Sequence, residues 1–235
     1  MLEVSHLTKR YGKTTACSDL CFTLNEGSIT ILLGPNGAGK STVMKAITGF
    51  LRHEGTIRIN GIENHLPESR RVIGYIPEIP SFYPNLTAAE HLEFLARGYR
   101  LKDYKGRAEQ LLKRFELYEH RKKFGDELSK GMQQKLNICL GLLTEPSLLL
   151  LDEPFIGLDP HAIKELRSVM EEMRAEGKTL LVSTHIIDSI ETLWDRVLIM
   201  RKGTIEADVS RTDLEKTTAS LEDLFFAVTE GSLGE

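Results

Sequence analysis

The sequence predicts an α/β fold whose central sheet carries an antiparallel β subdomain and an inserted α-helical subdomain. Three features of the chain support this prediction. Runs at 28–33, 148–151 and 179–184 are almost entirely apolar, short alternating strands precede the first run, and a long amphipathic block separates the first two. A strand that is apolar on both faces is typical of a parallel sheet that helices cover on both sides.

The size and composition of the chain are those of an ordinary globular protein. Its 235 residues are 41% hydrophobic and 27% charged, enough to bury a full core. The formal net charge of -4 shows no excess of basic residues of the kind that binds phosphate backbones, so we expect no nucleic-acid partner. Cys17, Cys21 and Cys139 form no C-x-x-C pair, which favours reduced thiols over a metal site. The N-terminus is no signal peptide and a proline breaks the most apolar region, 138–151, so we expect a soluble chain.

The N-terminal segment predicts two antiparallel strands joined by a loop with an aromatic side chain. Residues 2–5 and 19–24 roughly alternate apolar and polar side chains, as half-buried antiparallel strands do. The loop at 9–12 contains Tyr11, whose ring can stack on a nucleotide base. A tyrosine in such a loop is also common as an ordinary surface residue, so both interpretations stay open on these residues alone.

A phosphate-binding loop follows the apolar strand at 28–33. Gly34–Ser41 reads GPNGAGKS and fits the P-loop pattern G-x-x-x-x-G-K-[ST] between a predicted strand and a predicted helix. Its glycines let successive backbone N–H groups converge on phosphate oxygens, and the following helix adds its positive N-terminal end. Lys40 can bridge the β- and γ-phosphates, and the Ser41 hydroxyl can ligate Mg²⁺.

The middle of the chain predicts two strands followed by a helical block. The strands are expected at 53–61 and 72–78, and a proline ends the second. Thr87 and Glu90 have the spacing of a capping box, so a helix is expected to begin there. The amphipathic pattern then continues to about Phe124, and we interpret this block as an inserted helical subdomain.

A further helix and an acidic strand end come next. Ser129 is a natural N-cap for a helix that ends before Pro146. The apolar run at 148–151 is typical of a central parallel strand, and Asp152 and Glu153 follow it directly. Acids at the carboxyl end of such a strand lie at the edge where open α/β sheets bind ligands.

The last part of the chain predicts another helix and another buried strand. Asp159 is the expected N-cap and Pro160 the first residue of a helix that stops at Gly177. The strand at 179–184 ends at His185, which would face the ligand edge of the sheet. A hairpin at 196–207 and a helix at 221–228 complete the predicted elements.

Together, these stretches resemble the ATP-binding cassette (ABC) ATPases over essentially the whole chain. The matching positions are Tyr11, GPNGAGKST at 34–42, Glu78, LSKGMQ at 128–133, LLLLDE at 148–153, GLD at 157–159 and His185. The resemblance implies a P-loop NTPase core of the RecA-like type within one ATPase domain, 1–235. Its parts would be a β subdomain with the P-loop core at 1–83 and 144–210, a helical subdomain at 84–143 and a C-terminal helical tail at 211–235.

The resemblance also implies a set of site residues with ATP and Mg²⁺ as ligands. ATP would be bound by Tyr11, Gly34, Pro35, Asn36, Gly37, Ala38, Gly39, Lys40, Ser41, Thr42, Ser129, Gly131 and Asp159. Mg²⁺ would be held by Ser41, Asp152 and Glu78. Catalysis would use Glu153 as general base, Lys40 on the phosphates, and His185 to contact the γ-phosphate and orient the base.

A second ATP-binding subunit would complete the site. The resemblance implies a head-to-tail dimer, in which Ser129 and Gly131 of one cassette cap the γ-phosphate held by the other and Asp159 links the two sites. Two positions depart from the family pattern, because Glu78 replaces a loop glutamine and the signature reads LSKGM where LSGGQ is commoner. A carboxylate at position 78 can still ligate Mg²⁺, although it changes the charge around the ion.

The resemblance implies an ATP-hydrolysing subunit that drives a separate transmembrane permease from the cytoplasmic face of the cell membrane. The segment 221–225 and the compact length are similar to subunits of two-component exporters of the ABC-2 type, which indicates export. The alternative is a soluble single-cassette ABC ATPase that serves a cytosolic assembly machine. A P-loop kinase would leave LSKGM and His185 without a role, and an intact Glu153 argues against a regulator that does not hydrolyse ATP. These motifs specify neither the transported substrate nor whether the dimer pairs identical chains.

Overall fold

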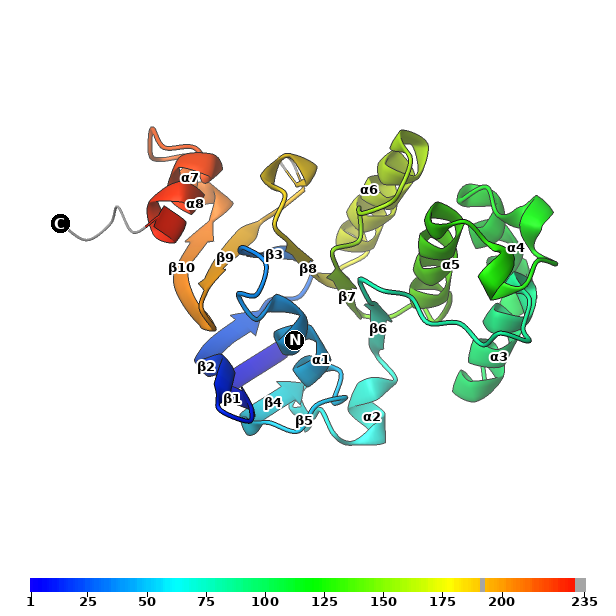
Figure 1. Ribbon diagram of the computed structural model, residues 1–235, viewed down its shortest axis with the longest axis horizontal. Helices are drawn as coiled ribbons and strands as arrows, with labels where there is room; N and C mark the ends of the chain where they lie inside the picture. The colour runs from blue at the N-terminus through cyan, green and yellow to red at the C-terminus, as the bar shows by residue number, and fades with distance from the viewer. Residues whose placement is uncertain (191–192, 231–235) are drawn as a thin grey trace.

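The computed structural model describes residues 1–190 and 193–230, which form two sheets and a separate group of helices (Figure 1). Among these residues, the smaller sheet is antiparallel and has the strand order β2-β1-β4-β5. Its strands are β1 (Leu2–Tyr11), β2 (Thr14–Leu24), β4 (Glu54–Ile59) and β5 (Ile62–Glu63). A short helix, α2 (Pro67–Arg70), leads from this sheet to the larger one. The predicted antiparallel β subdomain is confirmed.

The larger sheet is mainly parallel and has the order β10-β9-β3-β8-β7-β6 within the described residues. Its strands are β3 (Ile29–Leu33), β6 (Ile73–Ile76), β7 (Leu148–Asp152), β8 (Thr179–Thr184), β9 (Arg196–Arg201) and β10 (Thr204–Ser210). Of the strands described in this sheet, β10 alone runs antiparallel, paired with β9 in the predicted hairpin. The parallel pairing places the ends of β3, β7 and β8 at one edge, as expected for the fold.

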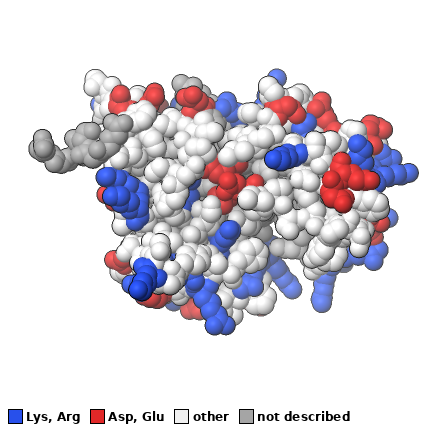
Figure 2. Space-filling view, in the orientation of Figure 1, with Lys and Arg blue, Asp and Glu red and all other residues white. Residues whose placement is uncertain are grey.

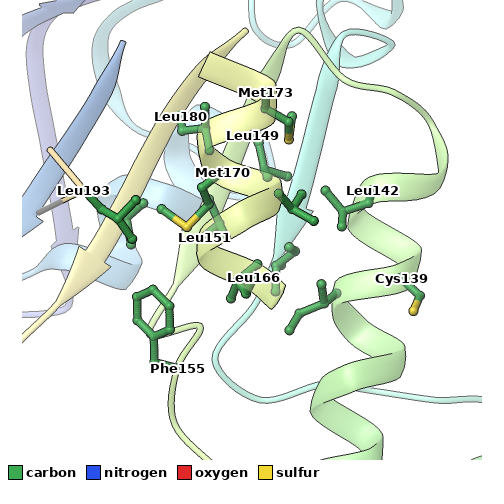
Figure 3. Packing of buried hydrophobic residues seen from close by; sticks show 14 of the residues in the cluster. Cys139, Leu142, Leu149, Leu151, Phe155, Leu166, Met170, Met173, Leu180 and Leu193 are labelled. Carbon is green, nitrogen blue, oxygen red and sulfur yellow. The ribbon is translucent and has the colours of Figure 1, made fainter. Parts of the chain in front are cut away.

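The central strands are buried on both faces because a different layer covers each face. Leu149 and Leu151 point into the core formed with α5 (Lys130–Leu143) and α6 (Pro160–Ala175), where Leu166 and Met170 meet them (Figure 3). Their neighbours Leu148 and Leu150 point the other way, into a second core under α1 (Lys40–Ile47) and the antiparallel sheet. Each such leucine is fully buried and stabilises the fold by about 1.5–3 kcal/mol.

The helical subdomain lies beyond β6, at the right of Figure 1. It consists of α3 (Ala88–Tyr99), α4 (Tyr104–Arg114) and α5, and it includes the predicted capping box. The Thr87 backbone and side chain hold the pKa of the Glu90 carboxyl below its ordinary value. The prediction of one helical pattern to about Phe124 is wrong in detail. Arg100 adopts a left-handed conformation that ends α3, and the described chain between α4 and α5 forms two 3₁₀ turns, Tyr118–His120 and Gly125–Glu127. Buried apolar residues beside these turns, Phe115, Leu117 and Leu128, preserve the amphipathic pattern, so periodicity alone does not reveal the breaks.

The C-terminal part packs beside β9 and β10. It contains α7 (Arg211–Leu214) and α8 (Leu221–Glu230), so the predicted terminal helix is confirmed, while 231–235 of the predicted tail lie outside the described residues. A 3₁₀ turn, Ile187–Ser189, follows β8. Figure 2 shows acidic and basic side chains interspersed over one face of the molecule. None of the helices in the described part of the chain has the length and apolar character needed to span a bilayer.

Candidate functional site

The P-loop connects β3 to α1, and its shape depends on glycine. Gly37 and Gly39 have φ of 81° and 107°, in the left-handed region that side chains disfavour. A Cβ at Gly34 would lie 2.4 Å from the Met200 carbonyl oxygen, and one at Gly39 would lie 2.4 Å from that of Ala16. The loop is therefore packed against β9 and β2, and only glycine allows this approach at both positions.

The Lys40 ammonium is buried inside the loop and faces an acid. Its Nζ donates to the carbonyl oxygens of Gly34 at 2.7 Å and Pro35 at 3.3 Å. It also lies 3.4 Å from Oε1 of Glu153, and both side chains are only 6% exposed. A buried ammonium needs such partners, so the loop and the acid together keep this cation at the bottom of the site.

Asp152 is a buried carboxylate whose Oδ1 accepts from two hydroxyl groups. The Ser41 hydroxyl donates to it at 3.2 Å, and the Ser183 hydroxyl donates to the same oxygen. Ser183 is the β8 residue directly opposite Asp152 in the parallel ladder. Carboxylate and hydroxyl oxygens are the ligands that Mg²⁺ prefers, so Ser41 and Asp152 suit this ion.

Glu153 has an unusual backbone conformation that fixes its carboxylate at the edge of the sheet. Its φ is 48°, left-handed for a residue that is not glycine. Its N–H donates to the carbonyl oxygen of Ser183 at 3.1 Å and lies 3.2 Å from the hydroxyl of the same residue. Oε1 lies 2.9 Å from Nδ1 of His185, at the end of β8. The predicted acid and histidine are therefore adjacent at the edge where the P-loop also lies.

A hollow of about 360 Å³ opens over these groups. It is lined by Ala16, Asn36, Gly37, Gly39, Lys40, Ser41, Thr42, Glu78 and Glu153. Glu78 reaches it from the exposed loop that follows β6, so the predicted metal ligands approach from three different segments. Ala38 is buried beneath the loop, and its N–H donates to the Pro35 carbonyl oxygen at 3.1 Å. Lys40, Ser41 and Glu78 thus line one concave surface, and Asp152 lies behind Ser41 without lining it.

Tyr11 is the last residue of β1, and its predicted position in a loop is wrong. The strand runs for ten residues through register shifts near Val4, Leu7 and Lys9, which hide its length from the alternating pattern. The Tyr11 ring is 49% exposed, and the Lys9 ammonium lies 5.0 Å from its centroid. Its partner in the sheet is Thr14, two residues before Ala16, which lines the hollow, although Tyr11 itself does not line it.

Seven of the predicted nucleotide-binding residues do not line the hollow. Four of them are Gly34, Pro35 and Ala38 of the P-loop itself and Tyr11 on β1, and the other three lie at the starts of α5 and α6. Ser129 caps α5 by accepting from the Met132 N–H at 3.3 Å, and Asp159 caps α6 by accepting from the Ala162 N–H at 2.9 Å. Both predicted caps are confirmed. Gly131 is on the first turn of α5, next to Ser129. One chain therefore does not bring these residues together with its own P-loop.

Two polar residues that hold predicted site residues in place are not evident from the sequence. Ser183 holds Asp152 and the backbone of Glu153, yet in the sequence it is only one hydroxyl in an apolar strand. Lys135 is buried, and its Nζ lies 2.7 Å from Oδ2 of Asp159, which together with the Ala162 N–H keeps the pKa of that carboxyl below its ordinary value. A charged residue inside the apolar pattern of α5 is the signal that could have identified Lys135.

The sequence of this chain is similar to those of known ATP-binding proteins. Residues 17–156 match the family described as ABC transporter. The ABC-type transporter ATP-binding protein EcsA of Bacillus subtilis (strain 168) is 38% identical over 100% of this chain and 98% of its own length. The SkfA peptide export ATP-binding protein SkfE of the same organism is 34% identical, over 89% of each chain.

Solved structures with the same architecture agree as well. The structure of an ATP-binding subunit of an ABC transporter has a TM-score of 0.91 and 38% identity, covering 97% of this chain and 99% of that one. The dimeric post-hydrolysis state of the cassette MJ0796, bound to ADP and Pi, has a TM-score of 0.79 and 28% identity, covering 89% and 98%. With the P-loop and its facing acids in place, the chain belongs to the ABC transporter family, as an ATP-binding and ATP-hydrolysing subunit.

Proposed function

We propose that this chain powers the export of a substrate through a separate transmembrane permease, from the cytoplasmic face of the membrane. One observation carries the hydrolytic part of the proposal, namely the Glu153 carboxylate held between Lys40 and His185 at the P-loop hollow. Export is supported by relatives such as SkfE, which is named for peptide export. These relatives favour a transporter subunit over a soluble assembly ATPase.

ATP is proposed to bind with its phosphates in the P-loop and its base beside Tyr11. The backbone N–H groups of Gly34–Thr42, apart from Pro35, which has none, surround the phosphates, and Lys40 exchanges its carbonyl partners for phosphate oxygens. The half-exposed Tyr11 ring offers a flat surface for the base. The ATPase domain is proposed to have the subdomain limits given above, 1–83 with 144–210 and 84–143.

Ser41, Asp152 and Glu78 are proposed to hold Mg²⁺. Their oxygen atoms are hard ligands, and Ser41 and Glu78 line the same hollow while Asp152 lies directly behind Ser41. When bound, the ion neutralises charge on the β- and γ-phosphates. Glu78 adds a full negative charge where the family has a neutral amide, so this site has one more charge to balance.

Hydrolysis is proposed to use Glu153 as general base. Its carboxylate takes a proton from the attacking water, whose oxygen bonds to the γ-phosphorus as the bond to the ADP oxygen breaks. Lys40 stabilises the charge on the transferred phosphoryl group. His185 holds the carboxylate through its Nδ1 and leaves its other nitrogen free to contact the γ-phosphate, which orients the base.

A second cassette is proposed to complete each site. Ser129 and Gly131 lie at the exposed N-terminus of α5, away from the P-loop of their own chain, and they would cap the γ-phosphate of the partner. Asp159 would sit between the two sites. The dimeric structure of MJ0796, a relative at 28% identity, supports an arrangement of two cassettes.

The loop after Glu78 and the helical subdomain are proposed to contact the permease. Large apolar side chains are exposed there, including Ile79 at 79%, Tyr83 at 56% and Phe94 at 55%. Apolar groups exposed in this number on neighbouring segments commonly mark a protein interface. Their position on the subdomain that carries Ser129 would couple closure of the dimer to movement of the permease.

The test is an affinity purification of Glu153→Gln from detergent-solubilised source cells with ATP and Mg²⁺. We expect this variant to bind ATP, to lose at least about a hundredfold in turnover, to form a stable dimer by light scattering, and to retain a multi-spanning membrane protein. Lys40→Ala is the matched control, because it should lose the ATP-dependent dimer. Recovery of soluble partners alone would reject the permease, and near-normal turnover would reject Glu153 as the base.

A further inference from the structure

The segments that carry the two acids of the site are both held by one helix, α5. Glu153 is followed by Pro154, and Glu78 is preceded by Pro77. In Figure 1, α5 lies between the parallel sheet and the other helices of its subdomain. Proline has no N–H, so these two residues can be held through their backbone only by their carbonyl oxygens.

Gln134 of α5 holds the segment after Glu153. Its Nε2 donates to the Pro154 carbonyl oxygen at 3.2 Å, and its side chain is buried. The same turn of α5 touches this segment elsewhere, because a Cβ on Gly131 would lie only 3.0 Å from the Gly157 carbonyl oxygen.

Asn137, one turn further along α5, holds the segment before Glu78. Its Nδ2 donates to the Pro77 carbonyl oxygen at 2.8 Å and also to Oε1 of Gln134 at 3.2 Å. Asn137 is 5% exposed and Gln134 is 4% exposed. A continuous chain of hydrogen bonds therefore runs from the Pro77 carbonyl, which is partly buried, through both buried amides to the Pro154 carbonyl.

Lys135 adds a charged contact at the far end of the same segment. Its Nζ lies 2.7 Å from Oδ2 of Asp159 and 3.3 Å from Oε2 of Glu116, a residue of the helical subdomain. The Lys135 side chain is only 9% exposed, so these acids are what compensate its burial. The segment 154–159, which follows Glu153, is thus held by α5 at both ends, by Gln134 at Pro154 and by Lys135 at Asp159.

We propose that Gln134 and Asn137 are positioning residues, which set Glu153 and Glu78 relative to each other and to the signature residues at the start of α5. The inference rests on the proposed function, since it assumes that Glu153 acts as base and that Glu78 ligates Mg²⁺. A shift of α5 then reaches both acids through two buried amides. The movement of α5 that brings Ser129 onto the partner's ATP therefore also sets the positions of Glu153 and Glu78 in the chain's own site.

The variants Gln134→Ala and Asn137→Ala test this proposal. Losing the Pro77 contact frees the Glu78 loop, so Asn137→Ala should weaken Mn²⁺ binding to the ATP-loaded protein about tenfold, measured by electron paramagnetic resonance. Losing the Pro154 contact should lower kcat about tenfold for Gln134→Ala, with KM within about twofold. For each readout, Mn²⁺ affinity and kcat, the fold-loss in the double variant should be smaller than the product of the fold-losses in the two single variants, because the two amides bond to each other.

Asn64→Ala is the matched control. Asn64 is a buried asparagine that donates to the carbonyl oxygens of Ala46 at 2.7 Å and Ile47 at 3.2 Å, at the end of α1 opposite the P-loop. It should lower the thermal midpoint without changing Mn²⁺ affinity or kcat. The proposal fails if the α5 variants behave like this control, with lower stability and unchanged Mn²⁺ affinity and kcat.

A second pair of variants keeps the test decisive if the alanine variants do not fold. Gln134→Met and Asn137→Leu preserve side-chain volume and remove the donors, while Asn137→Gln retains an amide and should recover part of the lost Mn²⁺ affinity. Failure of the proposed function is distinguishable, because wild-type protein would then show no ATP turnover or no Mn²⁺ binding. Failure of the positioning proposal leaves both wild-type properties intact.

Discussion

Nδ1 of His185 lies 2.9 Å from Oε1 of Glu153, although 32 residues separate them in the chain. The pairing of β7 with β8 places the two strand ends side by side, and the left-handed backbone of Glu153 turns its carboxylate toward the histidine. A non-glycine residue in this conformation costs on the order of 1 kcal/mol, which the surrounding hydrogen bonds offset. The strained backbone of Glu153 therefore directs its carboxylate toward His185.

His185→Ala should lower kcat about a hundredfold and change KM little, because the base remains and loses its orientation. Steady-state ATP hydrolysis checks this. His65→Ala is a suitable control, since His65 also pairs with a glutamate, Glu63 at 3.3 Å, but on the exposed surface away from the site. Equal loss of kcat in the two variants would contradict an orienting role for His185.

Ser183→Ala should raise the Mg²⁺ concentration needed for half-maximal turnover about tenfold. The variant removes a hydroxyl that donates to the buried Asp152 carboxylate and that lies beside the Glu153 N–H. A hydrogen bond to a charged group contributes about 1.5–3 kcal/mol, and a tenfold change requires about 1.4 kcal/mol. A Mg²⁺ titration at saturating ATP measures the effect, and Ser183→Thr should restore much of the wild-type dependence. An unchanged titration curve would show that the hydroxyl is not needed to hold Asp152.

Tyr11→Ala should weaken ATP binding several-fold, and Tyr11→Phe should not. The ring surface contributes by stacking on the base, at about 1–3 kcal/mol in related systems, and phenylalanine retains it. Calorimetry with the non-hydrolysing Glu153→Gln background gives the affinities directly. If alanine and tyrosine bind ATP equally well, Tyr11 is an ordinary surface residue.

The regular parts of the fold could be predicted because each has a local cause. Thr87, Ser129 and Asp159 cap helices through their own side chains, and the apolar strands need two covering layers. Features that depend on distant contacts could not be predicted. The φ of Glu153 is supported by Ser183 from another strand, and the length of β1 depends on irregular pairing with β2.

The same distinction holds for the candidate site. The P-loop, the acidic strand end and the histidine each carry a compact pattern, and the structure places Lys40, Glu153 and His185 next to one another. Asn137 and Gln134 carry no pattern of their own, because their role depends on which carbonyl oxygens the folded chain brings within reach.

The three cysteines should differ strongly in reactivity. Burial raises the pKa of the Cys17 thiol to about 11 and also raises the pKa of Cys139, while Cys21 is exposed. At pH 8 the buried thiols are neutral, so iodoacetamide should alkylate Cys17 about two orders of magnitude more slowly than an ordinary thiol. Peptide mass mapping over time measures this, and labelling in guanidinium should make all three equal. Rapid labelling of Cys17 in the folded protein would contradict its burial beside the P-loop.

Arg114 connects the helical subdomain to the core, and its contribution to stability should depend on pH. Its guanidinium donates to both carboxylate oxygens of Glu172 at 2.7 and 2.6 Å, and to Glu165 at 2.9 Å, so α4 is tied to α6. Arg114 keeps the pKa of the Glu172 carboxyl below its ordinary value of 4.5. Because the folded-state pKa is the lower one, the stabilisation is present above about pH 4.5 and is lost as the pH falls through the folded-state pKa.

Arg114→Met should therefore lower the free energy of unfolding by about 1 kcal/mol at pH 7, a modest value because the pair is partly exposed to solvent. Urea denaturation at pH 7, 5 and 3.5 measures the difference from wild type, which should shrink at the lowest pH. Lys113→Met is the control, because the Lys113 ion pair with Glu109 at 2.7 Å stays within α4, and its ammonium otherwise lies over the Tyr118 ring of the same subdomain. A difference for Arg114→Met that stays constant across this range would mean that the lost stability comes from the packing of the arginine stem and not from its charge.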